Sequence, residues 1–176
     1  MPSKKTDRLV IVRDTREKRG FDFKRFKNVL VVNAKLDTGD YSLPWLQTGP
    51  ASISIERKSL DDLVGCCVSG KSGSRERFER ELARSREISR FMVVVEAGMQ
   101  DVWLHKYVSR VPPKSVLASL NAWFCRFGVP FVFAGTRRGA EWLIHDVLSK
   151  YAAHAREYVE AMESGTSPQC PPGQNS

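Results

Sequence analysis

Three side chains within residues 39–62 have the types and spacing of a catalytic site. Glu56 and Lys58 end an alternating run of polar and apolar residues, so on a β-strand they point to the same face. The connection before this run contains proline and glycine but no apolar run, which predicts a hairpin loop that brings Asp40 beside the pair. The sequence therefore directs two carboxylates and one ammonium group at a single point.

Two acids that face a lysine suit a hard divalent cation. Carboxylate oxygens bind Mg²⁺, or Mn²⁺ as a substitute, while the ion keeps several of its waters. In such a site the lysine orients or deprotonates an attacking water and stabilises negative charge on a phosphate. Asp40, Glu56 and Lys58 therefore predict metal-dependent cleavage of a phosphodiester bond.

The basic charge of the chain is concentrated in the half that holds these residues. The 176 residues carry a net charge of +8, with 20 basic and 13 acidic side chains in residues 1–90 against 8 and 7 in residues 91–176. A half that contacts a polyanion such as DNA is expected to have this excess. The length and the hydrophobic content of 41% predict one domain with a buried core.

Several classes of protein are disfavoured by what the sequence lacks. No apolar run approaches the length of a membrane span, and the first residues lack the apolar core of a signal peptide, so we expect an intracellular protein without a membrane partner. It would be cytoplasmic in a prokaryote or a virus and nuclear in a eukaryote. The four cysteines show no CxxC pair and no histidine at zinc-ligand spacing, so neither a disulfide framework nor a zinc site is indicated.

The loop of residues 68–74 and the helix after it supply candidate DNA contacts. The loop lacks the spacing of a phosphate-binding P-loop, which argues against a nucleotide cofactor and favours a basic lid carrying Lys71, or a plain linker. Most arginines of residues 75–90 can pair with glutamates of the same helix. Arg75 and Arg77, beside the loop, are assigned to substrate phosphates.

Strands at the start of the chain, followed by alternating strands and helices, predict an α/β fold with a central mixed sheet flanked by helices. Strands are expected at residues 9–12, 29–32, 41–43, 52–58, 91–95 and 129–133, and helices from residues 59, 75, 114 and 136. Residues 99–112 are expected to be irregular. The predicted domain covers residues 8–160, between a flexible basic arm (1–7) and a disordered tail (161–176).

The aromatic residues have two interpretations. Phe21, Phe23 and Phe26 alternate with basic residues, which is typical of a nucleic-acid surface or of aromatics packed inward beneath solvated charges. Trp103, Trp123 and Trp142 are assigned to the core, whereas Trp45, in the hairpin loop, is placed to stack on a base. Two broad apolar helix faces pack the core or pair with a second subunit.

Together these motifs resemble the XPF-type, structure-selective endonucleases, a branch of the PD-(D/E)XK restriction-like nucleases. The branch has a GD pair, a spacer and ERKxxxD, which stand here as Gly39-Asp40, Glu56-Arg57-Lys58 and Asp62. An upstream DxRE element matches Asp14, Arg16 and Glu17. Taken alone, those three residues favour an ordinary exposed strand exit, and the resemblance reverses that interpretation. It covers about residues 8–155.

The resemblance implies a restriction-endonuclease-like fold and a role for each matched residue. It assigns metal binding to Asp40 and Glu56, with Glu17 or Asp14 as further acidic contributors, and catalysis to Lys58. Arg16, Arg57 and Asp62 would support the site through ion pairs or phosphate contacts, although strand alternation points Arg57 away from Glu56. Members of the family act as homodimers or heterodimers, and many cut flapped, forked or branched DNA in repair or recombination.

Two departures from the family pattern are visible. The helix-hairpin-helix domain common in the family is missing, which predicts a stand-alone nuclease domain, and Glu81 stands where the family has glutamine. A junction-resolving or restriction-type nuclease of the same fold remains an alternative. A non-catalytic DNA-binding or dimerisation module is the other, and it is disfavoured because Asp40, Glu56 and Lys58 are all present.

Overall fold

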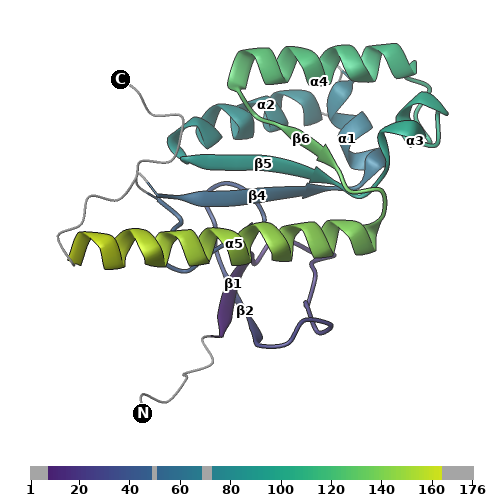
Figure 1. The fold of residues 1–176 in the computed structure, drawn as a ribbon. Helices are drawn as coiled ribbons and strands as arrows, with labels where there is room; N and C mark the ends of the chain where they lie inside the picture. The colour runs from purple at the N-terminus through teal and green to yellow at the C-terminus, as the bar shows by residue number, and fades with distance from the viewer. Residues whose placement is uncertain (1–7, 49–50, 69–72, 164–176) are drawn as a thin grey trace.

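Six strands form one mixed sheet in the computed structural model, which describes residues 8–48, 51–68 and 73–163 (Figure 1). The strand order is β2-β1-β3-β4-β5-β6. The strands are β1 (Leu9–Asp14), β2 (Val29–Ala34), β3 (Tyr41–Ser42), β4 (Ile53–Lys58), β5 (Arg90–Val95) and β6 (Phe131–Phe133). β3 is antiparallel to both of its neighbours, and every other pair is parallel. The predicted mixed sheet is confirmed.

Helices cover both faces of the sheet. They are α1 (Leu60–Cys67), α2 (Ser74–Arg84), the 3₁₀ turn η1 (Ser85–Glu87), α3 (Met99–Trp103), α4 (Pro113–Phe127) and α5 (Arg137–Glu163). α1, α2 and α4 lie on one face, and the long α5 lies on the other (Figure 1). The predicted α/β architecture with flanking helices is therefore confirmed.

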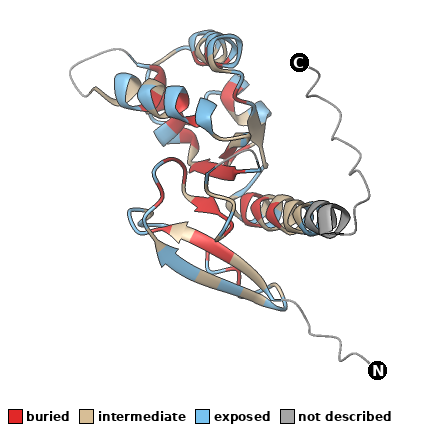
Figure 2. Ribbon diagram, turned by 90° about the vertical axis from the view of Figure 1, so that its left-hand side faces the viewer, coloured by how far each residue is buried: buried red, intermediate tan, exposed pale blue. Residues whose placement is uncertain are grey.

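The two helical layers bury alternate residues of the central strands. Val93 and Val95 of β5 pack against α1, α2 and α4, whereas Val94 packs with Ile55 against α5. This period of two is the expected result of burying both faces of a strand. Figure 2 shows the consequence, because the central strands are buried while the edge strand β2 is largely open to solvent.

The direction of β3 determines where the functional residues meet. The other strands all end at one side of the sheet, which we call the carboxyl edge, and the antiparallel β3 begins there. Asp14, Lys58 and Val95 end their strands at this edge, and Asp40 directly precedes β3. A single reversed strand therefore brings Asp40 to the edge at which the parallel strands end.

Several element boundaries and two core assignments differ from the sequence predictions. Instead of one helix over residues 75–90, the structure has α2 followed by the 3₁₀ turn η1. Residues 99–103, expected to be irregular, form the helix α3, and the strand expected at residues 129–133 is limited to Phe131–Phe133. α5 continues three residues beyond the domain boundary predicted at residue 160, and the predicted arm lies outside the described residues. Trp123 is buried as predicted, but Trp103 and Trp142 are more than half exposed, so their assignment to the core is wrong. Phe21 and Phe23 are buried, which confirms the inward-packed alternative.

No helix in the described part of the chain is long and apolar enough to cross a membrane.

Candidate active site

Asp40 and Glu56 lie opposite each other on adjacent strands. Tyr41 of β3 pairs with Ile55 of β4, and extending this register by one residue places Asp40 opposite Glu56 on the same face. The Asp40 N–H donates to the Ile55 carbonyl at 2.9 Å, and Asp40 Oδ2 accepts the Arg57 N–H at 2.8 Å. The hairpin predicted from the sequence is present and holds this carboxylate against β4.

The glycine before Asp40 is required by the close approach of the two strands. Gly39 has a φ of 81°, and a Cβ at this position would lie 2.2 Å from Ser54 Oγ. Ser54 in turn donates to the Thr38 carbonyl at 2.7 Å, so it is fixed in place. Only glycine fits this turn without displacement, which explains physically why glycine precedes the aspartate.

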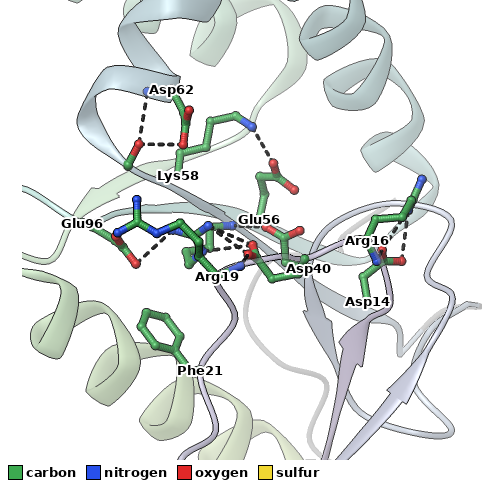
Figure 3. A network of polar contacts seen from close by, with 12 residues as sticks. Asp14, Arg16, Arg19, Phe21, Asp40, Glu56, Lys58, Asp62 and Glu96 are labelled. Carbon is green, nitrogen blue, oxygen red and sulfur yellow. Dashed lines mark hydrogen bonds and ion pairs between the residues drawn. The ribbon is translucent and has the colours of Figure 1, made fainter. Parts of the chain in front are cut away.

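Lys58 points at the two acids, as strand alternation predicts. Its Nζ donates to Glu56 Oε1 at 2.6 Å (Figure 3). The same atom lies 4.6 Å from the ring centroid of Phe78. Burial alone would lower the pKa of Lys58, but the charge of Glu56, the hydrogen bond to it and the charges of other nearby groups together outweigh burial and raise the pKa. Lys58 is therefore a cation in this arrangement, suited to stabilising charge and orienting water rather than to accepting a proton.

The two carboxylates are held at a point of excess negative charge. Burial raises the pKa of Asp40 to about 8, and the charge of Glu56 adds to this increase. Burial also raises the pKa of Glu56 to about 7, because it outweighs the attraction of Lys58. A divalent cation would replace the protons that these carboxylates otherwise retain near neutral pH.

Glu81 of α2 is a third acid at this point. It accepts the Gly39 N–H at 3.3 Å, and its charge is a further cause of the raised pKa of Glu56. In the sequence, Glu81 stands out only as a departure from the family glutamine. The signal was obscured because Glu76, Glu79 and Glu87 share its helical stretch and read as partners for arginine.

The pair of Asp40 and Glu56 fits a magnesium-like ion. Among the described residues, no group of three His, Cys, Asp or Glu side chains is arranged to hold a metal. Mg²⁺ is commonly bound through one or two carboxylates while it keeps several waters, so two converging acids with raised pKa values are sufficient. Asp40 and Glu56 are the residues that would hold such an ion.

Glu17 is predicted to bind a metal, but in the structure its carboxylate is paired with Arg57. Its two carboxylate oxygens accept from Arg57 Nε at 3.0 Å and Nη2 at 3.1 Å. The same carboxylate accepts the Arg19 N–H at 2.6 Å. Glu17 is thus a buried partner of Arg57, and it acts on the site through its charge, which contributes to the raised pKa of Asp40.

Arg57 supports the site from the opposite face of β4. Its side chain lies between Glu17 and Glu96, with Nη1 at 3.0 Å from Glu96 Oε1. Arg137 of α5 binds the same Glu96 oxygen at 2.5 Å. The main chain of Arg57 meanwhile fixes Asp40. Alternation does point this side chain away from Glu56, and the ion pairs join β4, the end of β5, α5 and the segment after β1.

Comparison with known proteins assigns most of the chain to one family. The family model of the ERCC4 domain matches residues 13–145, which include every described residue of the candidate site. The chain belongs to the ERCC4 domain family. No curated protein sequence matches it.

Two solved structures share the fold of this ERCC4 domain. XPF from Aeropyrum pernix is 19% identical, with 88% of this chain and 69% of that chain covered and a TM-score of 0.59. XPF from Aeropyrum pernix in complex with DNA is 19% identical, with 83% of this chain and 66% of that chain covered and a TM-score of 0.60. This chain thus spans about two thirds of each, and at this identity the likeness shows the fold.

Asp14 of the ERCC4 domain has a structural environment unlike that of Asp40. Its carboxylate is 2% exposed and accepts from the Arg16 N–H, from Arg16 Nε and from the Leu36 N–H at 2.6–2.8 Å. Burial alone would raise the pKa of Asp14, but the hydrogen bonds from Arg16 and Leu36 outweigh it and lower the pKa. This differs from the predicted role as a further acidic ligand, because these donors neutralise Asp14.

Arg16 and Asp62 also have identifiable partners. Arg16 Nη2 donates to the Leu36 carbonyl at 2.6 Å, while the rest of its side chain is mostly exposed and feels the charges of Glu81 and Asp40. Asp62 accepts from Ser59 Oγ at 2.6 Å in the first turn of α1 (Figure 3). Arg16 remains placed for a phosphate, whereas Asp62 stabilises the helix that follows Lys58.

The predicted DNA-binding arginines separate into two kinds. Arg75 Nη1 donates to the Cys67 carbonyl at 3.1 Å, and its guanidinium lies over Trp123 at 5.2 Å, so its contacts are those of a packing residue. Arg77 is exposed, and its side chain donates to Ser74 Oγ of its own helix at 3.3 Å. Lys71 lies outside the described residues. Arg77 is therefore the better-placed phosphate contact of the two arginines.

Proposed function

We propose that this ERCC4 domain is a metal-dependent DNA endonuclease. One observation carries the proposal: a pair of facing carboxylates, Asp40 and Glu56, have raised pKa values beside a lysine ammonium group at the carboxyl edge. Such a concentration of negative charge is costly to the fold unless a cation is bound there. Family membership is consistent with this chemistry.

The residues divide the work of hydrolysis between them. Asp40 and Glu56 would hold a Mg²⁺ or Mn²⁺ ion, which would supply an activated water and neutralise charge on the phosphate. Lys58, which stays protonated, donates hydrogen bonds to the water or to a phosphate oxygen. The Arg57 N–H orients Asp40. The Arg57 side chain links β4 to Glu17 in the segment after β1.

We further propose a branched, flapped or forked DNA as the substrate and a homodimer or heterodimer as the working form, in DNA repair or recombination. The basic excess of residues 1–90 supports a polyanionic substrate. The structurally similar XPF from Aeropyrum pernix was solved in complex with DNA. Exposed Arg16 and Arg77 are candidate phosphate contacts.

The decisive experiment is a cleavage assay of the wild type, Lys58→Ala and Lys150→Ala on labelled single-stranded, duplex, flap, fork and four-way DNAs. Lys150 is a matched control, because it is also ion-paired but lies in the middle of α5. We expect cutting with Mg²⁺ or Mn²⁺, none with EDTA, and a loss of at least ~10²-fold in rate for Lys58→Ala alone.

Two results would count against the proposal. Cutting by Lys58→Ala at the wild-type rate would show that the site is placed incorrectly. A folded wild type that binds DNA but cuts none of the panel, with either metal, would instead identify a binding module.

A further inference from the structure

Four apolar side chains are exposed on the short segment formed by α3 and the five residues after it. Met99 and Trp103 belong to α3, and Leu104 and Val108 follow it. Trp103 is 53% exposed and Val108 is 90% exposed. We call these four residues the α3 patch. Exposed apolar residues gathered on one segment mark an interaction surface.

The α3 patch lies beside the candidate active site. α3 begins four residues after the end of β5, and the Glu96 N–H donates to the Lys58 carbonyl at 2.9 Å. The Val108 N–H donates to Asp61 Oδ1 at 2.8 Å, and Asp61 is in the first turn of α1. The segment is therefore attached to the chain at Lys58 and again at Asp61, at the carboxyl edge.

Hydrogen bonds hold the segment in one conformation. Asp101 accepts from the Gly98 N–H at 2.8 Å and from Lys106 Nζ at 3.0 Å. The Tyr107 hydroxyl donates to the Val111 carbonyl at 2.7 Å, and the Tyr107 ring stacks on His105 at 4.3 Å. A ligand that binds a surface fixed in this way loses little affinity to ordering the protein.

The charges around the patch favour a polyanion. Residues 99–114 contain three basic side chains, Lys106, Arg110 and Lys114, against one acid, Asp101. Lys106 and Asp101 form an ion pair with each other, which leaves Arg110 and Lys114 as the basic excess. An exposed aromatic ring among cations is the arrangement with which proteins bind single-stranded nucleic acid, because bases stack on the ring and phosphates meet the cations. A protein partner would have no comparable need for these cations.

We propose that Trp103 stacks on an unpaired base next to the cleaved phosphate, so that the α3 patch distinguishes a single-strand junction from continuous duplex. This inference rests on the proposed function and adds a specificity-determining residue to it. The sequence alone predicts such a stacking role for Trp45. Because β3 starts at the carboxyl edge and runs away from it, Trp45 follows the far end of β3, at the opposite edge.

The inference is tested by DNA binding, with Ca²⁺ in place of Mg²⁺ so that affinity is measured by fluorescence anisotropy apart from cleavage. The proteins are the wild type, Trp103→Ala, Trp103→Phe and, as a matched control, Trp45→Ala, which removes a tryptophan that is 79% exposed. The DNAs are a continuous duplex, a fork, and the same fork with one abasic nucleotide at each position near the junction.

We expect Trp103→Ala to bind the fork about 5- to 150-fold more weakly than the wild type, the effect of losing one stacked base. Its affinity for duplex should not change. One abasic position should weaken the wild type by the same factor and have no effect on Trp103→Ala. Trp103→Phe should restore most of the affinity, and Trp45→Ala should match the wild type.

The outcomes separate this inference from the proposed function. Equal fork affinity of Trp103→Ala and the wild type would overturn the inference even if cleavage is intact. A change in self-association of Trp103→Ala by sedimentation velocity, with unchanged DNA affinity, would overturn it in favour of a protein contact. Base-dependent binding by a wild type that never cuts would support the inference while refuting the proposed activity.

Discussion

The substitution Asp40→Asn is expected to stabilise the metal-free protein while it abolishes cleavage. The pKa of Asp40 is raised to about 8 from an ordinary value of 3.8, so at pH 7 the folded state must keep a proton that the unfolded chain releases. One pKa unit corresponds to about 1.4 kcal/mol, and the roughly three units between 3.8 and pH 7 amount to about 4 kcal/mol.

Asparagine avoids most of this cost. Its amide oxygen still accepts the Arg57 N–H, although it forms a weaker hydrogen bond than a carboxylate. We therefore expect a net stabilisation of about 2 kcal/mol at pH 7, which corresponds to an increase in Tm of roughly 4–8 °C for a domain of this size. Thermal and urea unfolding in EDTA measure it.

The pH dependence gives a second measure with a defined sign. The folded state binds the Asp40 and Glu56 protons more tightly than the unfolded state. The contribution of these two groups to the free energy of unfolding is therefore highest at low pH and falls as pH rises toward about 8. The wild type in EDTA should lose stability between pH 6 and 8, and Asp40→Asn should lose less. Mg²⁺ should stabilise the wild type more at pH 8 than at pH 6.

Asp14→Asn is the matched control, because it makes the same chemical change in the same sheet. The lowered pKa of Asp14 means that its carboxylate stabilises the fold above the ordinary pKa and loses this effect only as pH falls through the lowered value. Asp14→Asn should therefore be less stable than the wild type by about 2–4 kcal/mol, and this difference should be the same at pH 6 and at pH 8. If Asp40→Asn loses stability at pH 8 as Asp14→Asn does, the reasoning about the site is refuted.

Three further substitutions test other parts of the structure. Gly39→Ala should lower the free energy of unfolding by about 1–3 kcal/mol and impair cleavage, because its Cβ would clash with β4. The control Gly65→Ala on α1 has open space around it, so it should be neutral or stabilising in urea unfolding. Arg57→Ala leaves buried Glu17 without its cation and leaves Glu96 with Arg137 alone, so it should cost about 3–5 kcal/mol by the same measurement. Wild-type stability would exclude a supporting role. Glu81→Gln removes a charge that raises the pKa of Glu56, so the acidic limb of the cleavage pH profile should move to lower pH, and an unmoved limb would place Glu81 outside the site.

The fold class and the central three residues of the site could be predicted because they depend on local patterns. Alternation alone directs Glu56 and Lys58 to one face, and a hairpin loop is sufficient to bring Asp40 opposite them. The N–H of Arg57 donates to Asp40, whereas its side chain pairs with Glu17 on the other face of β4. This arrangement also follows from alternation once the strand is known.

The remaining site residues depend on contacts between distant parts of the chain. Asp14 and Asp40 follow similar local patterns, and only the position of Leu36 and Arg16 neutralises one of them. Arg75 looks like its neighbours in sequence, but the packing of α4 buries it over Trp123. Trp103 was assigned to the core because large apolar residues are usually buried, and the short helix that exposes it has no clear sequence signal.

Because β3 is reversed, the candidate active site and the loop that connects β3 to β4 lie at opposite ends of the strands. The connection from β3 to β4 turns at the edge opposite the site, so its length does not alter the register of Asp40 against Glu56, which the paired residues Tyr41 and Ile55 determine. A peptide tag or a fluorescent label inserted next to exposed Trp45 would therefore sit at the opposite end of the strands from the candidate active site. This ERCC4 domain could in that way be immobilised on a surface, or followed by energy transfer, with its catalytic edge left open.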